Sequence, residues 1–197
     1  TDAYQGNASI TNNDAQTSLS VLGNADPYIS IIASPGTVQN SSSCILDATL
    51  GNAGNYTIAA GTLKATFNVG ANATITGLAA GSDPRWTLTS LSTGNGNIAV
   101  LTNTGGGFSS FDVGSVYFNL TGTIVSPPTV ITANIDYTNT TDAYQGNASI
   151  TNNDAQTSLS VLGNADPYIS ILAIPGTVQH NSSSILDVTL GNAGNYT

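Results

Sequence analysis

The chain has 197 residues, of which only 7% are charged, and its formal net charge is −9 at pH 7. Lys64 and Arg85 are its only strong cations, so it lacks the basic face that binding to nucleic acid or to an anionic membrane surface requires. Glu and Met, which favour helices, are absent, whereas the strand formers Thr, Val, Ile and Tyr are frequent. The composition predicts an all-β protein with no nucleic-acid partner and no membrane insertion.

Polar and apolar residues alternate in short runs along the chain, and clusters rich in Gly, Pro, Asn and Ser separate the runs. This period-two pattern is typical of strands with one buried face. In chain order, the clearest predicted strands lie at residues 4–10, 17–22, 44–50, 62–69, 85–91, 115–125, 129–137 and 157–162. Such a succession of strands without a helix predicts an immunoglobulin-like antiparallel β-sandwich.

The chain also contains a long internal repeat, because residues 1–57 align without gaps on residues 141–197. The period is therefore 140 residues, which matches one domain rather than the ~20–50 residues of a solenoid unit. We expect a tandem repeat of period 140, seen through a window on a longer polypeptide. A duplicated end of a two-domain protein is the alternative. The two copies differ at six pairs of positions: Ile32/Leu172, Ser34/Ile174, Asn40/His180, Ser41/Asn181, Cys44/Ser184 and Ala48/Val188.

The segment "LGNADP", at residues 22–27 and again at 162–167, is the best candidate for a domain boundary. It places one complete β-sandwich repeat at residues 27–163. Residues 1–25 are then the terminal strands of a preceding repeat, and residues 166–197 are the first strands of a following one. A linker of roughly five residues that contains a proline predicts a restricted angle between successive domains.

The sequence offers no catalytic residues. His180 is the only histidine, so residues 27–163 lack the imidazole of a Ser-His-Asp site or a typical zinc site. We therefore predict that the protein is not an enzyme and needs no cofactor. Calcium is the one metal considered, because loop carboxylates near the boundary resemble its oxygen ligands, although Asp and Asn also form ordinary turns. The calcium candidates are Asp14, Asp26, Asp142, Asp154 and Asp166.

A surface with so little charge must stay soluble through hydroxyl groups, amides or attached sugars. Nine Asn-X-Ser/Thr motifs occur, some of which such a composition produces by chance. Together these features predict an extracellular or cell-surface protein. Cys44 is the only cysteine and is expected to be a small buried residue, so no disulfide supports the fold. The glycosylation candidates are Asn7, Asn40, Asn55, Asn72, Asn119, Asn139, Asn147, Asn181 and Asn195.

Two segments carry a resemblance to a known family. "DPYISIIASPGTVQNSSSCILDATLGNAGNYTIAAGTLKATF" and "ITNNDAQTSLSV" resemble the opening and the close of the prokaryotic conserved repeat domain called domain of unknown function 11. The resemblance covers the framing parts of residues 27–163, whereas residues 70–130 match only in general character. It implies an immunoglobulin-type sandwich repeated in large surface proteins, with a scaffold or adhesin role.

The prediction is an extracellular structural repeat protein whose serial β-sandwich domains form a filament, stalk or sheath. Its partners are adjacent copies of the same repeat, either as a homopolymer or within one long tandem chain. The first alternative is a surface adhesin that binds glycans or cells through Trp86 and the tyrosines. The second alternative is a pilin in which one subunit donates a terminal strand such as residues 4–21 to the sheet of its neighbour.

Overall fold

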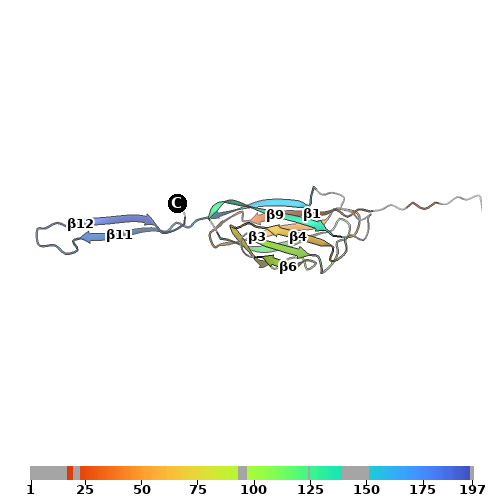
Figure 1. Cartoon of the computed structure of the whole chain (residues 1–197), viewed down its shortest axis with the longest axis horizontal. Coiled ribbons are helices and arrows are strands. Elements are labelled where there is room, and N and C mark those ends of the chain that lie inside the picture. Colours follow the sequence, from red (N-terminus) through yellow and green to blue (C-terminus); the bar gives the residue numbers. More distant parts are fainter. Residues whose placement is uncertain (1–16, 20–22, 93–96, 124, 139–150, 196–197) are drawn as a thin grey trace, which may run out of the picture.

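The computed structural model describes residues 17–19, 23–92, 97–123, 125–138 and 151–195. The described residues form twelve strands and no helix, and hence nothing of the length and apolarity that a membrane-crossing helix requires. Ten strands build one elongated sandwich, and the last two form a hairpin that extends from its end (Figure 1). The strands are β1 (Pro27–Ser34), β2 (Thr37–Gln39), β3 (Ser43–Asn52), β4 (Leu63–Asn68), β5 (Ala73–Leu78), β6 (Thr87–Ser92), β7 (Ile98–Thr102), β8 (Val113–Gly122), β9 (Ser126–Tyr137), β10 (Asp154–Leu162), β11 (Pro167–Ile174) and β12 (Ile185–Asn192).

The sandwich has a four-stranded sheet in the order β1-β3-β8-β5 and a six-stranded sheet in the order β2-β10-β9-β4-β7-β6. The predicted all-β sandwich is therefore confirmed. One pair departs from the antiparallel expectation, because β2 runs parallel to β10, with Thr37 opposite Ser160 and Gln39 opposite Leu162. The cause is the path of the chain, which leaves β1 in one sheet, crosses at Pro35 and Gly36, and continues as β2 in the other.

Alternating side chains from the two sheets form a single core. Along β4 the buried residues Leu63, Ala65 and Phe67 alternate with more exposed ones, as period-two patterning requires. The ring of Phe67 meets that of Phe118 on β8 edge to face, with 4.7 Å between the ring centroids. Burial of each large aliphatic or aromatic side chain contributes roughly 1.5–3 kcal/mol, so this core can hold the fold without a disulfide.

Three buried asparagines, Asn52, Asn97 and Asn103, hold the loops at the ends of the sandwich. Asn103 accepts a hydrogen bond from the backbone N–H of Leu63 at 2.8 Å and donates to the carbonyls of Ala59 and Gly106. Each side chain therefore supplies partners to backbone groups that no strand satisfies.

The chain enters the sandwich at one end and leaves it at the other. The N–H of Ile29, near the start of β1, donates to the carbonyl of Asn152, just before β10. At the far end the N–H of Asn40, just after β2, donates to the carbonyl of Leu162, the last residue of β10. The path from β1 to β2 thus runs alongside β10 over its whole length, which is roughly 30 Å at about 3.3 Å per residue.

Candidate interface at the extended hairpin

The hairpin β11–β12 has the same register as the pair β1–β3 in the sandwich. Pro27 lies opposite Asn52 and Ser34 opposite Ile45 in the first pair, and Pro167 lies opposite Asn192 and Ile174 opposite Ile185 in the second. Residues separated by 140 positions therefore occupy equivalent places, and the hairpin has the local structure of the first two long strands of a sandwich.

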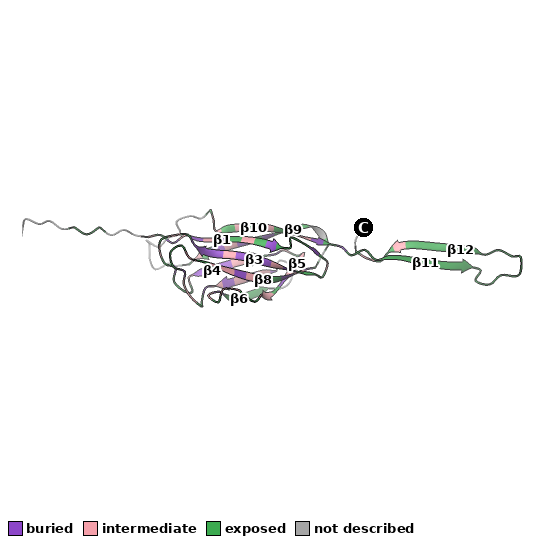
Figure 2. Cartoon of the chain, turned by 180° about the vertical axis from the view of Figure 1, so that it is seen from behind, coloured by how far each residue is buried: buried purple, intermediate pink, exposed green. Residues whose placement is uncertain are grey.

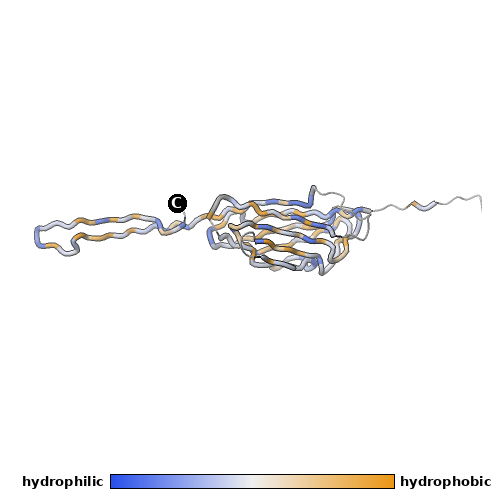
Figure 3. Tube along the Cα trace, in the orientation of Figure 1, coloured by the Kyte–Doolittle hydropathy of each residue, from blue (hydrophilic) through white to orange (hydrophobic). Residues whose placement is uncertain are grey.

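The two pairs differ in what covers them. Leu50 is completely buried, whereas its counterpart Leu190 is 73% exposed. Figure 2 shows the contrast, with a largely buried β3 and an exposed β12, and Figure 3 shows that apolar residues recur along both hairpin strands. The exposed apolar side chains of the two strands are Ile169, Ile171, Leu172, Ile174, Ile185, Leu186, Val188 and Leu190.

In the sandwich, the outer edge of β3 pairs with β8 from Ser43–Thr121 to Gly51–Val113, while strands of the six-stranded sheet cover its apolar face. In the described structure the corresponding edge of β12 has no neighbouring strand. Exposed apolar surface rimmed by polar residues marks an interaction site. An unpaired strand edge is likewise a template for another strand. The hairpin is thus the strongest candidate interface in the described part of the chain.

A short, hydrogen-bonded linker joins the hairpin to the sandwich. After β10 ends at Leu162, only residues 163–166 precede β11. The N–H of Asp166 donates to Asn192 Oδ1 at 2.8 Å, and the N–H of Asn164 donates to Asn195 Oδ1 at 2.6 Å. The linker is therefore fixed to the base of the hairpin through two of its four backbone amides.

The same contacts occur at the start of the sandwich. The N–H of Asp26 donates to Asn52 Oδ1 at 3.0 Å, and the N–H of Asn24 donates to Asn55 Oδ1 at 2.9 Å. Gly54 must be glycine, because a Cβ atom there would collide with the backbone of residues 24–26. The motif "GNAGN" at 51–55 and 191–195 thus fixes the preceding linker in both copies.

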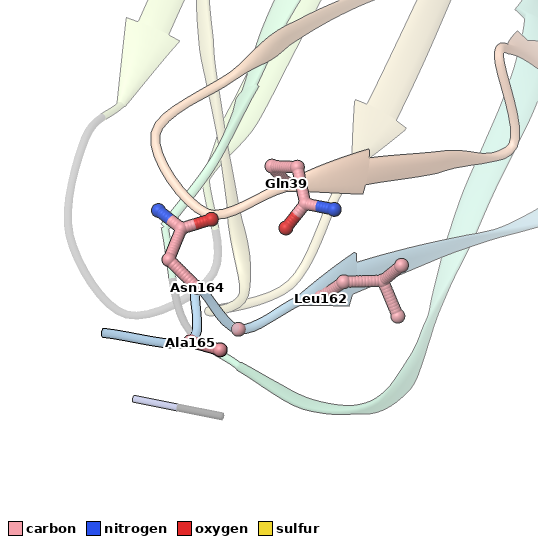
Figure 4. A pocket seen from close by; sticks show the side chains of 5 residues that line it. Gln39, Leu162, Asn164 and Ala165 are labelled. Atoms are coloured by element: carbon pink, nitrogen blue, oxygen red, sulfur yellow. The ribbon is translucent and has the colours of Figure 1, made fainter. Parts of the chain in front are cut away.

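A depression lies where the linker leaves the sandwich (Figure 4). Gln39 from the end of β2, Leu162 from the end of β10, and Gly163, Asn164 and Ala165 from the linker line it. No carboxylate is among these residues, so the depression offers amide and apolar contacts rather than a strong cation site.

Three of the five calcium candidates lie within the described residues. Asp26 Oδ1 accepts a hydrogen bond from Asn152 Nδ2 at 3.1 Å, and Asp154 Oδ1 accepts one from Asn134 Nδ2 at 2.8 Å. Asp166 is exposed in the linker. In the described ranges no three His, Cys, Asp or Glu side chains gather into a metal site. Asp14 and Asp142 lie outside the described residues.

The described glycosylation candidates differ in exposure. Asn119 is exposed on the outer face of β8, whereas Asn40 is half-buried and its Oδ1 atom is enclosed without a hydrogen-bond partner. Asn55, Asn181 and Asn195 are exposed, and Asn72 is half-buried. Asn7, Asn139 and Asn147 lie outside the described residues.

Two sequence hypotheses concerned single side chains. Cys44 is 5% exposed, which confirms the prediction of a small buried residue, and burial raises the pKa of its thiol. Trp86 had two interpretations, an exposed contact and a core aromatic of the sandwich; the core interpretation is confirmed and the exposed contact is wrong. The side chain of Trp86 is 4% exposed and lies in the core, with its ring centroid 5.7 Å from that of Phe108.

Arg85 is held in an ion-pair cluster that sequence reasoning missed. Its guanidinium lies 2.6 Å from carboxylate oxygens of both Asp83 and Asp112, and it stands over the ring of Phe108 at 3.9 Å. Desolvation opposes ionisation of both carboxyl groups, but the hydrogen bonds and charge of Arg85 outweigh it and lower the pKa of each. In turn, the hydrogen bond to Asp83 is the main cause that raises the pKa of Arg85. The cluster fastens the turn before β6 to the loop before β8, which is a structural role.

No protein-family model matches the chain, and no curated protein matches it either. Several solved structures are similar. The CARDB domain of a Pyrococcus furiosus protein, in complex with di-metal ions, is 19% identical, with a TM-score of 0.42 over 70% of this chain and 93% of that chain. A non-cellulosomal cohesin from the archaeon Archaeoglobus fulgidus is 9% identical, with a TM-score of 0.44 over 70% and 92%. An uncharacterized protein from Nocardia farcinica with an immunoglobulin-like fold is 10% identical, with a TM-score of 0.43 over 70% and 98%.

Proposed function

We propose that the chain belongs to an extracellular structural protein in which β-sandwich modules follow one another along one polypeptide and form a filament, stalk or sheath. The hairpin β11–β12 is the beginning of the next module, and its apolar face is covered by the body of that module. By "body" we mean the strands that correspond to β4–β10.

The observation that carries the proposal is the path of the chain through the sandwich. Because β1 starts beside the start of β10, and β10 ends where the hairpin begins, successive modules extend end to end rather than side by side. The four-residue linker, with its amides bonded to Asn192 and Asn195, limits bending at the joint. A row of such modules is a rod.

Other features agree with the proposal. The six-stranded sheet obtains β10 from the same chain, which favours covalently linked modules over strands donated between subunits. The low charge and the exposed Asn119 suit a glycosylated surface protein. The resemblance to the prokaryotic conserved repeat domain, domain of unknown function 11, implies the same role and stays a prediction.

A chain extended after Thr197 by a second copy of residues 58–162 tests the proposal. The added body is expected to fold onto β11–β12, so that amide hydrogen exchange in residues 185–192 slows and small-angle scattering shows a particle longer by about one module, roughly 30 Å. The chain of 197 residues is the control. An added body that stays unfolded with valine and also with alanine at position 188 would count against the proposal, as would isolated round particles of the natural polypeptide in negative-stain microscopy.

A further inference from the structure

The repeat creates a pairing problem. The hairpins β1–β3 and β11–β12 share their register and nearly all of their sequence, so each could in principle complete the body of the other's module. Exchange of identical elements and misassembly of neighbouring units are characteristic failures of repeat proteins. The few positions at which the hairpins differ therefore decide whether a body can distinguish them.

Five of the six differing positions in the first hairpin give a body little means to distinguish the two hairpins. Ile32, Ser34 and Ser41 are exposed in the sandwich. Asn40 lies half-buried in a turn, and its enclosed Oδ1 atom has no hydrogen-bond partner, so a change to histidine costs no hydrogen bond of that atom. Cys44 is buried, but its counterpart Ser184 brings its own partner, since the Ser184 hydroxyl donates to the carbonyl of Pro175 within the hairpin at 2.8 Å. A serine at this site need not leave a buried hydroxyl unsatisfied.

The pair Ala48/Val188 differs from the other five because it changes the size of a side chain in the core. Ala48 is completely buried in the core and lies directly opposite Val116 of β8. Valine is larger than alanine by two methyl groups, and interiors are packed so closely that such an insertion forces neighbouring side chains or the backbone to shift. Val188 has 46% of its surface exposed, so the hairpin meets no such restriction.

On the basis of the proposed function, we infer that Val188 fits the hairpin β11–β12 to a body with more room opposite this position than Val116 leaves. Val188 thereby hinders insertion of this hairpin into the module at residues 27–163. Its partner is the following module's own body, with a smaller residue at the place of Val116. The difference at one buried position thus discourages hairpin exchange between adjacent modules.

The full chain with Ala48→Val tests the premise. Urea denaturation followed through Trp86, the only tryptophan, is expected to show at least about a tenfold increase in the unfolding equilibrium constant. Ser34→Ile, which introduces the larger residue of the second copy at an exposed position, is the matched control and should change little. An Ala48→Val protein as stable as the unmodified chain would overturn the inference.

The double variant Ala48→Val/Val188→Ala then tests the exchange itself. The second hairpin now suits the body better than the first, so copies are expected to associate head to tail at concentrations at least about tenfold below those at which the unmodified chain associates. Light scattering after refolding measures this. If Ala48→Val alone does not fold, the double variant should recover the folded sandwich through association. A double variant that neither associates nor recovers the fold refutes the inference.

The two proposals fail in different ways. In the extended chain, Val188→Ala is expected to raise the denaturation midpoint of the added module, because that module has the tight site opposite Val116. Equal stability with Val and Ala would refute the inference but leave the serial arrangement intact. If the hairpin β11–β12 docks on the added body neither with valine nor with alanine at position 188, the serial arrangement itself fails.

Discussion

Replacement of Asn52 by alanine tests whether the buried asparagine at the base of β3 holds the start of the sandwich. Asn52 is completely buried, and its Oδ1 atom accepts from the N–H groups of Asp26 and Gly54 at 3.0 and 3.1 Å. Its Nδ2 atom donates to the carbonyls of Tyr56 and Ser109 at 2.6 and 3.0 Å. One side chain therefore supplies four hydrogen bonds to three separate segments.

The expected cost follows from what these groups lose. A buried backbone group left without a partner costs about 1–3 kcal/mol. Asp26 and Gly54 are only half-buried, so water replaces part of what Asn52 supplies. We therefore expect Asn52→Ala to lower the free energy of unfolding by about 3 kcal/mol rather than by the sum of four full penalties.

The chain contains a matched control, because Asn192 occupies the same place in the hairpin. Its Oδ1 atom accepts from Asp166 and Gly194 as Asn52 does from Asp26 and Gly54, but Asn192 is exposed and lies outside the sandwich. Asn192→Ala should change the unfolding free energy of the sandwich by less than about 0.5 kcal/mol. Urea denaturation with Trp86 fluorescence measures both variants. We expect this difference because the hairpin lies outside the sandwich and unfolds separately from it. Equal losses of unfolding free energy in the two variants would refute this expectation.

Three further predictions concern core packing, pH and glycosylation. Leu50→Ala should destabilise the sandwich by about 3 kcal/mol, whereas Leu190→Ala at the equivalent hairpin position should leave its urea midpoint almost unchanged, and equal effects would contradict the exposure difference. Arg85→Met should cost about 1 kcal/mol at pH 7, a value reduced for solvent screening because the cluster is partly exposed. Because Arg85 lowers the pKa of Asp83 and Asp112, this contribution is present above the ordinary carboxyl pKa of about 4 and is lost as the pH falls through the lowered values. The difference between variant and unmodified chain should therefore shrink from pH 7 to pH 2, and a constant difference would argue against the ion pairs. In glycopeptide mass spectrometry of the natural protein, Asn119 should be occupied and Asn40 should not, and the reverse pattern would contradict the exposure of the two side chains.

Most of the long strands of the sandwich were predictable from the sequence because burial follows period-two alternation, whereas β1, β5 and β7 lie outside the predicted segments. Phe67 on β4 and Phe118 on β8 lie on the faces that the pattern assigns to the core. The parallel pairing of β2 with β10 was not predictable, since β2 has only three residues and its partner lies more than 120 residues away in the sequence. Local patterns do not contain such long-range pairing.

The buried asparagines were missed because asparagine in a Gly-rich segment usually indicates an exposed turn. Asn52 and Asn103 share a signal that could have identified them, since each lies at the end of a strand and two residues before a glycine. Both glycines, Gly54 and Gly105, lie where a Cβ atom would collide with a neighbouring backbone. The hairpin as an interface followed from the repeat, whereas the importance of Ala48 required the burial that only the fold provides.

The parallel pair β2–β10 has a consequence for mechanical load. A pull on both ends of a module draws the chain before β1 and the chain after β10 in opposite directions, along strands that lie side by side. The bonds from Ser160 to Gly36 and from Asn40 to Leu162 are then strained together in shear instead of opening one after another like a zip. Resistance to tension would thus reside in a few residues where the chain changes sheets.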